Sequence, residues 1–289
     1  MIPESFEYHA PQSLAEAVGL AAQLGEEAKL MAGGHSLLPM MKLRLASPRH
    51  LIDLRRLSDL RYIREADGMI EIGALTTHFQ IESSELLQKN CPLLPETARE
   101  IGDVQVRNLG TLGGSLAHAD PAADWPPAIL ALDAEIKAVS PQGERWITGR
   151  DFFVELMTTA LRPGEILTMI RVPILPPRAG DAYLKLRQPA SGFAVVGAAV
   201  RLALNESGHV ESAAIGVTGV GPKAYRATAT ERELAGKSLT GRRLAEAAAH
   251  AADGVEANSD LFASAEYRRH LAAVYVRRAL QCALERAGA

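Results

Sequence analysis

Two stretches decide the fold: AGGHS at residues 32–36 and TLGGS at residues 111–115. Each has a glycine pair next to polar residues, where an extended or loop segment gives way to a helix-like one. Glycine pairs allow positive φ angles and leave backbone N–H groups open to a ligand, because no Cβ covers them. Two such loops facing each other would clamp the diphosphate of a dinucleotide. Helix caps and tight turns use the same residues, so spacing alone leaves both interpretations open.

The segments around the first loop alternate between helix and strand. Ser13 and Glu16 have capping-box spacing ahead of a 3.6-residue apolar period, which predicts a helix that runs to Gly25. The pattern then predicts a strand, a helix and a second strand at residues 29–31, 37–45 and 50–54.

The segments around the second loop mix hairpins and helices. The dipeptide Asp67-Gly68 predicts a hairpin turn between strands at residues 62–63 and 70–72. The remaining pattern predicts helices at residues 79–87, 92–101 and 121–132, and strands at residues 134–139, 146–147 and 165–172.

A proline- and glycine-rich linker at residues 173–180 separates this part from the rest of the chain. Beyond it we expect three strands, with a turn at residues 205–208, followed by helices. The strands are expected at residues 183–187, 193–204 and 210–217, and the helices at 227–234, 244–252 and 264–287. The fold class is therefore α+β, with a first domain in two α+β halves at residues 1–57 and 58–177 and a C-terminal α+β domain at residues 178–289.

Composition excludes several functional classes. The 289 residues include 31 Lys and Arg against 34 Asp and Glu, a net charge of −3, which argues against a nucleic-acid binder. The longest apolar run, residues 192–203, is too short for a membrane span and contains Arg201. The N-terminus has no signal-peptide pattern, so we expect a cytoplasmic protein; attachment to the inner face of the membrane stays open.

Other chemical motifs are weak. There is no Gly-x-Gly-x-x-Gly fingerprint and no complete Walker loop. The two cysteines, Cys91 and Cys282, are too few for an iron–sulfur cluster or a zinc site. His118 and Asp120 have no further histidine or cysteine nearby, so we expect no metal ligands in this chain.

Two long motifs resemble a known family. They are MAGGHSLLPMMKLRLA at residues 31–46 and VRNLGTLGGSLAHADPAAD at residues 106–124. The chain resembles, over its whole length, the FAD-binding medium subunit of molybdenum hydroxylases, and most closely that of aerobic carbon monoxide dehydrogenase. The resemblance implies a vanillyl-alcohol-oxidase-type (PCMH-type) FAD-binding domain followed by the C-terminal domain of carbon monoxide dehydrogenase flavoproteins.

The resemblance also implies roles for particular residues. Tyr183 and Lys185 would be the catalytic residues beside the flavin ring, with Lys185 also counted among the cofactor-binding residues. Asp124 would hydrogen-bond the ribityl region, and Asp120 in the same loop is a further candidate. The remaining FAD-binding residues would be Lys29, Leu30, Met31, Ala32, Gly33, Gly34, His35, Ser36, Ile101, Thr111, Leu112, Gly113, Gly114, Ser115 and Leu167.

The function that the resemblance implies is electron transfer within a dimer of heterotrimers. An iron–sulfur small subunit would carry [2Fe-2S] clusters, and a large subunit would carry molybdopterin. Electrons would pass through FAD to a quinone, NAD or another acceptor. Alternatives are the same subunit of a xanthine, N-heteroaromatic or aldehyde dehydrogenase, a stand-alone flavin oxidase, and a non-redox dinucleotide-binding scaffold.

Overall fold

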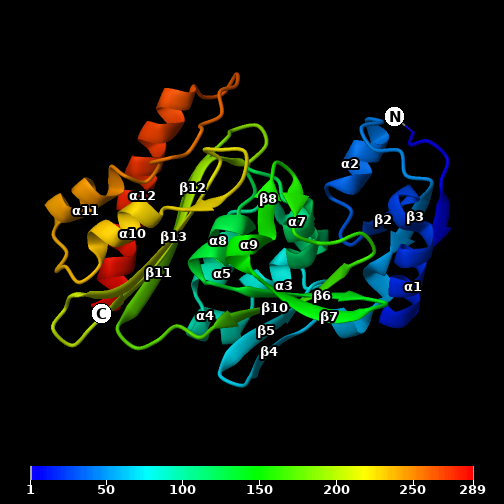
Figure 1. Cartoon of the computed structure of the whole chain (residues 1–289), viewed down its shortest axis with the longest axis horizontal. Coiled ribbons are helices and arrows are strands. Elements are labelled where there is room, and N and C mark those ends of the chain that lie inside the picture. The colour runs from blue at the N-terminus through cyan, green and yellow to red at the C-terminus, as the bar shows by residue number, and fades with distance from the viewer. Residues whose placement is uncertain (1, 289) are drawn as a thin grey trace.

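Four β-sheets organise the part of the chain, residues 2–288, that the computed structural model describes. In Figure 1 an N-terminal lobe lies at the right, a five-stranded sheet with its helices lies in the middle, and the C-terminal domain lies at the left. Within the described residues, no helix combines the length and the apolar character needed to cross a bilayer.

The N-terminal lobe is a three-stranded parallel sheet of order β1-β3-β2. Helix α1 packs on it through Ala17, Val18 and Ala21, as its apolar period predicts. Ser13 caps α1, but the Glu16 carboxylate accepts from the N–H of Gln12 and so does not close a capping box on Ser13. The elements are β1 (Glu7–His9), α1 (Leu14–Leu24), β2 (Ala28–Met31), α2 (Leu37–Lys42) and β3 (His50–Asp53), with 3₁₀ turns at Gly25–Glu27, Leu54–Arg56 and Ser58–Leu60.

The central sheet is antiparallel, with order β4-β5-β10-β6-β7. The predicted hairpin is confirmed, because Asp67 and Gly68 both have positive φ, at 51° and 73°. The strands are β4 (Ile63–Ala66), β5 (Met69–Gly73), β6 (Glu135–Ser140), β7 (Gly143–Thr148) and β10 (Ile166–Pro173), and β8 (Phe153–Glu155) pairs with β9 (Thr158–Thr159) in a separate ribbon.

The helices of the central part differ from prediction at several places. The helix predicted at residues 79–87 is two helices, because Ser83 ends the first and the Ser84 side chain caps the second. A further helix, α6, was not predicted; its apolar residues Val104 and Leu109 are exposed, so it has no apolar period. The helices are α3 (His78–Glu82), α4 (Glu85–Asn90), α5 (Leu93–Arg99), α6 (Val104–Leu109), α7 (Leu112–His118), α8 (Trp125–Ala131) and α9 (Gly149–Phe152).

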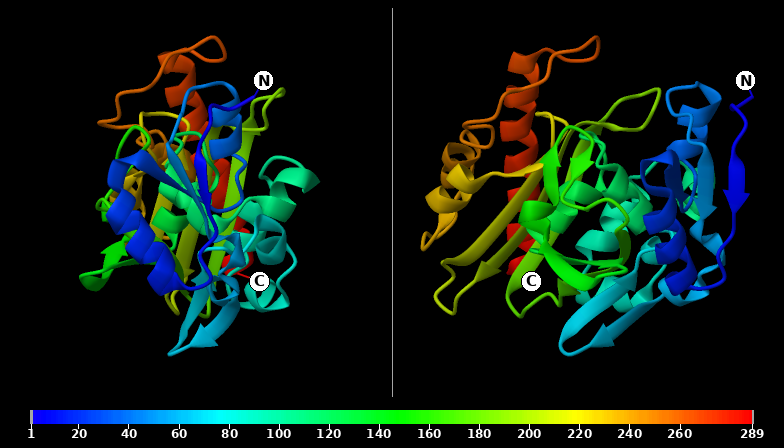
Figure 2. Two further views of the ribbon diagram at one scale, coloured as in Figure 1. Left: turned by 90° about the vertical axis from the view of Figure 1, so that its right-hand side faces the viewer. Right: turned by 45° about the vertical axis from the view of Figure 1, so that its right-hand side comes forward.

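The C-terminal domain is an antiparallel sheet of order β11-β12-β13-β14 that is covered on both faces. Helix α12 runs along the sheet (Figure 2), and Ala198 and Val200 of β12 share its core, whereas Ala199 belongs to the core that contains α8. Burial on both faces explains why β12 is an apolar run. The elements are β11 (Ala179–Arg187), β12 (Ala194–Leu204), β13 (Val210–Thr218), β14 (Tyr225–Arg226), α10 (Thr228–Leu234), α11 (Gly241–Ala248) and α12 (Ala265–Ala287).

Candidate functional site

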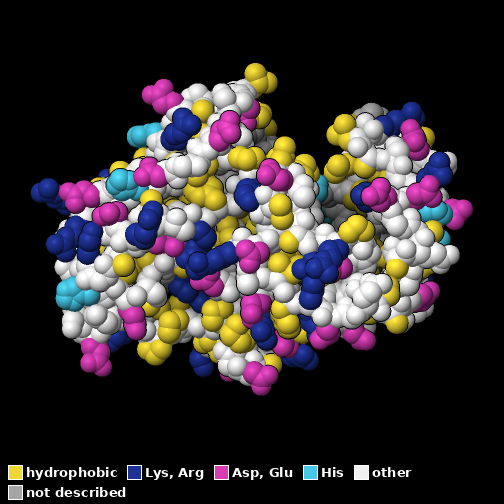
Figure 3. Space-filling model, in the orientation of Figure 1, with side chains coloured by type: hydrophobic (Ala, Val, Ile, Leu, Met, Phe, Trp, Pro, Cys, Tyr) yellow, Lys and Arg dark blue, Asp and Glu magenta, His cyan; other side chains and the backbone are white. Residues whose placement is uncertain are grey.

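A cavity of about 640 Å³ lies where the N-terminal lobe, the central part and the β11–β12 loop meet. Figure 3 shows the surface hollowed between the N-terminal lobe and the rest of the molecule. The volume is typical of small-molecule sites, which occupy roughly 300–1,000 Å³. Sixteen of the predicted site residues line it: Lys29, Leu30, Met31, Ala32, Gly33, Gly34, His35, Ser36, Ile101, Thr111, Gly113, Gly114, Ser115, Asp120, Asp124 and Leu167.

The first glycine loop leaves the carboxyl end of β2 and enters α2. Gly34 has a φ of 76°, and a Cβ on Gly33 would lie 2.2 Å from the Leu109 carbonyl oxygen, so the loop needs glycine at both positions. Within the described residues, no protein hydrogen bond uses the N–H groups of residues 33–36. Four consecutive donors at the rim of a cavity are the arrangement that binds an anionic group.

The second glycine pair has a different role from the one predicted. It lies in the first turn of α7, which Thr111 caps by accepting from the Gly114 N–H at 3.1 Å. The Gly113 N–H donates to the Ala74 carbonyl at 2.9 Å, and the Ser115 N–H donates to the Thr111 carbonyl. The prediction that this pair turns its N–H groups toward a phosphate is therefore wrong, since helix and sheet contacts already use them. A Cβ on Gly113 would lie 2.6 Å from the Ala74 Cβ, so close packing requires this glycine.

Asp124, at the start of α8, is the buried charged residue of the cavity. Its Oδ1 accepts from the Tyr183 hydroxyl at 2.5 Å, and Lys185 Nζ lies 2.8 Å from Oδ1 and 3.0 Å from Oδ2. Burial is the largest influence and raises the pKa of Asp124 from 3.8 to about 6, against the opposing effects of Lys185 and Tyr183. Burial, with the neighbouring Asp124 carboxylate, also raises the pKa of Tyr183 well above its usual value, so the phenol stays protonated.

Tyr183 and Lys185 lie behind Asp124 and do not line the cavity. The Lys185 side chain is fully buried, and its ammonium donates to the Glu100 carbonyl, the Gly192 carbonyl and Asp124. These contacts engage all three of its N–H groups. Lys185 thus joins the end of α5, the start of α8 and the β11–β12 loop, and it contacts the cavity lining through Asp124 and Gly192.

His78 is a cavity residue that sequence reasoning missed. Its Nδ1 accepts from Trp125 Nε1 at 3.1 Å, and since an indole N–H only donates, the ring proton is on Nε2. Burial lowers the pKa of His78 from 6.5 to about 3, and the charges of His35 and Arg107 add to this effect. His78 is thus a neutral donor at the cavity wall. The 47-residue separation from Trp125 left no local signal.

Other lining residues also lay outside the prediction. Gly192 and Phe193 come from the β11–β12 loop of the C-terminal domain, and Phe193 is 45% exposed. A solitary aromatic residue after a glycine carries no sequence signal for a ligand. Gly110 comes directly before the second glycine loop, and its position within the motif at residues 106–124 was the only sequence signal for it. Leu112, predicted to bind the cofactor, points into the hydrophobic core instead, because it lies on the inner face of α7.

The cavity residues fit FAD. The run of unused N–H groups at residues 33–36 matches an anionic diphosphate, and Asp124 can accept hydrogen bonds from sugar hydroxyls. Apolar walls at Ile101, Leu167 and Phe193 suit a planar ring. The fold and the cavity together define a dinucleotide-binding α+β protein without a Rossmann fingerprint.

Comparisons with known proteins give the family. Residues 4–175 match the FAD binding domain in molybdopterin dehydrogenase, and residues 181–283 match the CO dehydrogenase flavoprotein C-terminal domain. The chain belongs to the FAD-binding medium subunits of the molybdenum hydroxylase family. It is an oxidoreductase subunit of the carbon monoxide dehydrogenase and xanthine dehydrogenase family.

Individual relatives match along the whole chain. The carbon monoxide dehydrogenase medium chain of Hydrogenophaga pseudoflava is 43% identical, covering 99% of each chain. The 6-hydroxypseudooxynicotine dehydrogenase complex subunit alpha of Paenarthrobacter nicotinovorans is 39% identical, covering 99% of this chain and 97% of the relative. Among solved structures, a carbon monoxide dehydrogenase from Hydrogenophaga pseudoflava that lacks the Mo-pyranopterin moiety superposes with a TM-score of 0.96 at 44% identity over 99% of each chain. The predicted family and fold class are confirmed.

Proposed function

We propose that this chain binds FAD and transfers electrons within a heterotrimeric molybdenum hydroxylase of carbon monoxide dehydrogenase type. The main support for an FAD site is the run of unused N–H groups at residues 33–36, which line the cavity. FAD suits this position because a flavin exchanges single electrons with iron–sulfur clusters and pairs of electrons with an acceptor.

The chain's own residues bind and orient the flavin. Residues 33–36 donate to the diphosphate, and Asp124 accepts from the ribityl chain. Lys185 and Tyr183 act as positioning residues, because their hydrogen bonds hold Asp124 and the β11–β12 loop in place. We also propose a division into parts at residues 1–57, 58–177 and 178–289; the grouping of the strands into separate sheets supports it.

The partners are an iron–sulfur subunit and a molybdopterin subunit, which supply the [2Fe-2S] clusters and the molybdenum cofactor in a dimer of heterotrimers. The acceptor is a quinone, NAD or another oxidant. Carbon monoxide is the favoured substrate, because the carbon monoxide dehydrogenase relatives match at 43% and 42% identity over 99% of the chain. An N-heteroaromatic substrate is the second candidate, since the 6-hydroxypseudooxynicotine dehydrogenase subunit matches at 39%.

Co-expression with the genes of the proposed iron–sulfur and molybdopterin subunits and purification of the complex test the proposal. We expect a complex that contains FAD, iron and molybdenum and that reduces a dye when carbon monoxide is added. Reduction by an N-heteroaromatic compound instead would move the assignment to the second candidate, and reduction by an aldehyde would indicate an aldehyde dehydrogenase. A purified complex without flavin would overturn the FAD assignment, and flavin reduction by substrate in this chain alone would favour a stand-alone oxidase.

A further inference from the structure

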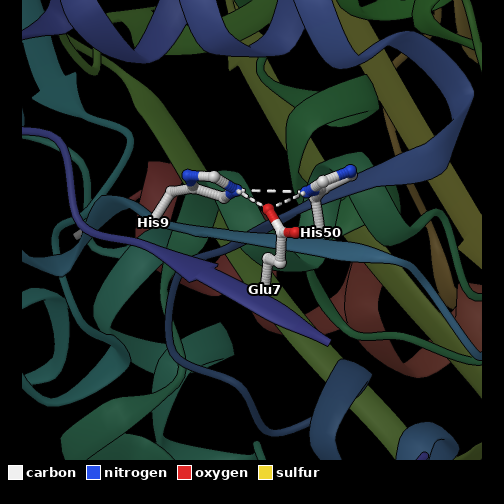
Figure 4. Close-up of side chains that lie close together, drawn as sticks. All are labelled: Glu7, His9 and His50. Carbon is white, nitrogen blue, oxygen red and sulfur yellow. Dashed lines mark hydrogen bonds and ion pairs between the residues drawn. The ribbon is translucent and has the colours of Figure 1, made fainter. Parts of the chain in front are cut away.

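Three potential metal ligands gather on the sheet of the N-terminal lobe. Glu7, His9 and His50 each offer one ligand atom, and these atoms all lie within 4.8 Å of one another. Figure 4 shows the two imidazole rings and the carboxylate directed at a common point above the strands. This cluster lies outside the cavity described above.

The strand register produces the cluster. Glu7 and His9 are two residues apart on β1, so their side chains lie on the same face of the sheet. His50, the first residue of β3, pairs with Glu7 in the parallel register and lies on that face too. The intervening Tyr8 lies on the opposite face, where its hydroxyl donates to Asp53 at 2.6 Å. His9 and His50 are 41 positions apart in the sequence, so sequence analysis did not detect this group and expected no metal ligands.

The separations match the coordination sphere of a metal ion. His9 Nε2 lies 3.2 Å from His50 Nδ1, His50 Nδ1 lies 3.3 Å from Glu7 Oε2, and His9 Nε2 lies 4.0 Å from Glu7 Oε2. A circle through three atoms at these distances has a radius of about 2.1 Å, which equals the zinc–nitrogen and zinc–oxygen bond length of about 2.0–2.2 Å. An ion at this distance would lie in the plane of the three atoms, so tetrahedral coordination requires the exposed Glu7 carboxylate to move closer to His9.

The exposure of the three side chains suits capture of an ion from solution. The His9 and His50 side chains are 24% and 16% exposed and are held by the sheet, whereas the Glu7 side chain is 74% exposed and can adjust. Two imidazoles with one carboxylate favour zinc and similar transition metals over magnesium or calcium, which prefer oxygen ligands.

We propose that Glu7, His9 and His50 form a binding site for a divalent transition metal, with Zn²⁺ as the representative ion. The ion would clasp β1, a strand of three residues, to the start of β3. The glycine loop follows β2, whose last residue Met31 pairs with Asp53 at the other end of β3. The clasp and the FAD loop are thus at opposite ends of the sheet, so the metal site is independent of the proposed function.

Titration of the chelator-treated full chain with ZnCl₂, followed by calorimetry, tests the site. We expect one equivalent of Zn²⁺ to bind and to raise the thermal midpoint, because an ion that binds only the folded state stabilises it. Co²⁺ in place of Zn²⁺ should give the visible absorption of a low-coordinate site. Glu7→Gln and His50→Ala should each weaken Zn²⁺ binding by at least about tenfold. His270→Ala, at an exposed histidine of α12, is the matched control and should leave binding unchanged.

Two results would overturn the proposal. One is the absence of a Zn²⁺-dependent heat and of any thermal shift in the wild-type chain. The other is binding that Glu7→Gln and His50→Ala leave as strong as in the His270→Ala control, because the ion would then occupy another place. Should His50→Ala fail to fold, the exposed Glu7→Gln substitution, together with His9→Asn, provides the same comparison.

Discussion

The Tyr183 hydroxyl donates a 2.5 Å hydrogen bond to Asp124 Oδ1 across 59 residues of sequence. Tyr183 belongs to β11 of the C-terminal sheet, and Asp124 precedes α8 of the central part. Both groups are buried, so the bond forms away from water and is charge-assisted when Asp124 is ionised. The contact ties the C-terminal domain to the wall of the cavity.

Tyr183→Phe removes this donor and leaves a buried carboxylate oxygen without it. We expect a loss of about 1.5–3 kcal/mol in the free energy of unfolding, the range for hydrogen bonds to charged groups. Tyr225→Phe is the matched control, because the Tyr225 hydroxyl donates only to the neutral Ala251 carbonyl and its loss should cost about 1 kcal/mol. Urea denaturation of both variants measures the difference. Equal losses would show that the Asp124 bond has no special strength.

Lys185→Met should be more damaging, since it removes the cation beside a buried carboxylate. Breaking such a pair by removing one partner costs about 3–5 kcal/mol. Asp124→Asn removes the charge left behind, so the double variant should lose less stability than the two single losses added together, by about 1 kcal/mol or more. Lys223→Met is the control: its ammonium donates to the carbonyls of Phe153 and Val154, and its effect should add to that of Asp124→Asn. Additivity for Lys185 as well would contradict the coupling.

We expect protonation of Asp124 to make the free energy of unfolding depend on pH. Because burial raises its pKa from 3.8 to about 6, the folded state keeps a proton that the unfolded chain has already released. Stability from this group therefore falls as the pH rises from about 4 to about 6. The unfolding free energy of the wild type minus that of Asp124→Asn should drop by about 3 kcal/mol over this window.

Asp260 provides the control of opposite sign. Burial acts to raise its pKa, but the N–H groups of Phe262 and Ala263 and the Arg268 guanidinium outweigh burial and lower the pKa below 3.8. The wild type minus Asp260→Asn difference should therefore decrease as the pH falls through that low pKa. Chemical denaturation from about pH 2 to pH 7 measures both differences, and a flat Asp124 difference between pH 4 and pH 6 would exclude a raised pKa for that group.

Local sequence patterns were sufficient for much of the fold. The alternation around Asp67-Gly68 predicted the β4–β5 hairpin, and the apolar period after Ser13 predicted α1. Helix α6 was not predicted, because Val104 and Leu109 face solvent and its apolar residues show no helical period. The two glycine motifs predicted residues on both sides of the cavity. They did not predict which backbone N–H groups have no hydrogen bond within the protein.

Long-range polar contacts limited the prediction of the site. Lys185 is held by the carbonyls of Glu100 and Gly192, and since every residue has a carbonyl, sequence contains no sign of such a partner. The same limit hid the pairing of His78 with Trp125, which depends on how α3 and α8 lie in space. The side chains in the sequence indicated which kind of ligand could bind, whereas the fold determined which hydrogen-bond donors remain available to that ligand.

Gly33→Ala tests the loop that donates to the cavity. The added Cβ would lie 2.2 Å from the Leu109 carbonyl oxygen; the oxygen belongs to the main chain and the Cβ is fixed to its own Cα, so the backbone must move. Moving it misaligns the N–H groups of residues 33–36, and we expect FAD to bind at least about tenfold more weakly, which corresponds to ~1.4 kcal/mol. Titration of the flavin-free chain with FAD, followed by the quenching of flavin fluorescence, measures the change.

The matched control for this substitution is Gly19→Ala. Gly19 lies on the exposed side of α1, and a Cβ there meets nothing within 4 Å. Alanine favours the helix over glycine by about 1 kcal/mol, so this variant should be more stable and bind FAD as the wild type does. If Gly33→Ala retained the wild-type affinity while Gly19→Ala behaved as expected, residues 33–36 would not hold the diphosphate, because a displaced loop could not keep four N–H groups directed at one anion.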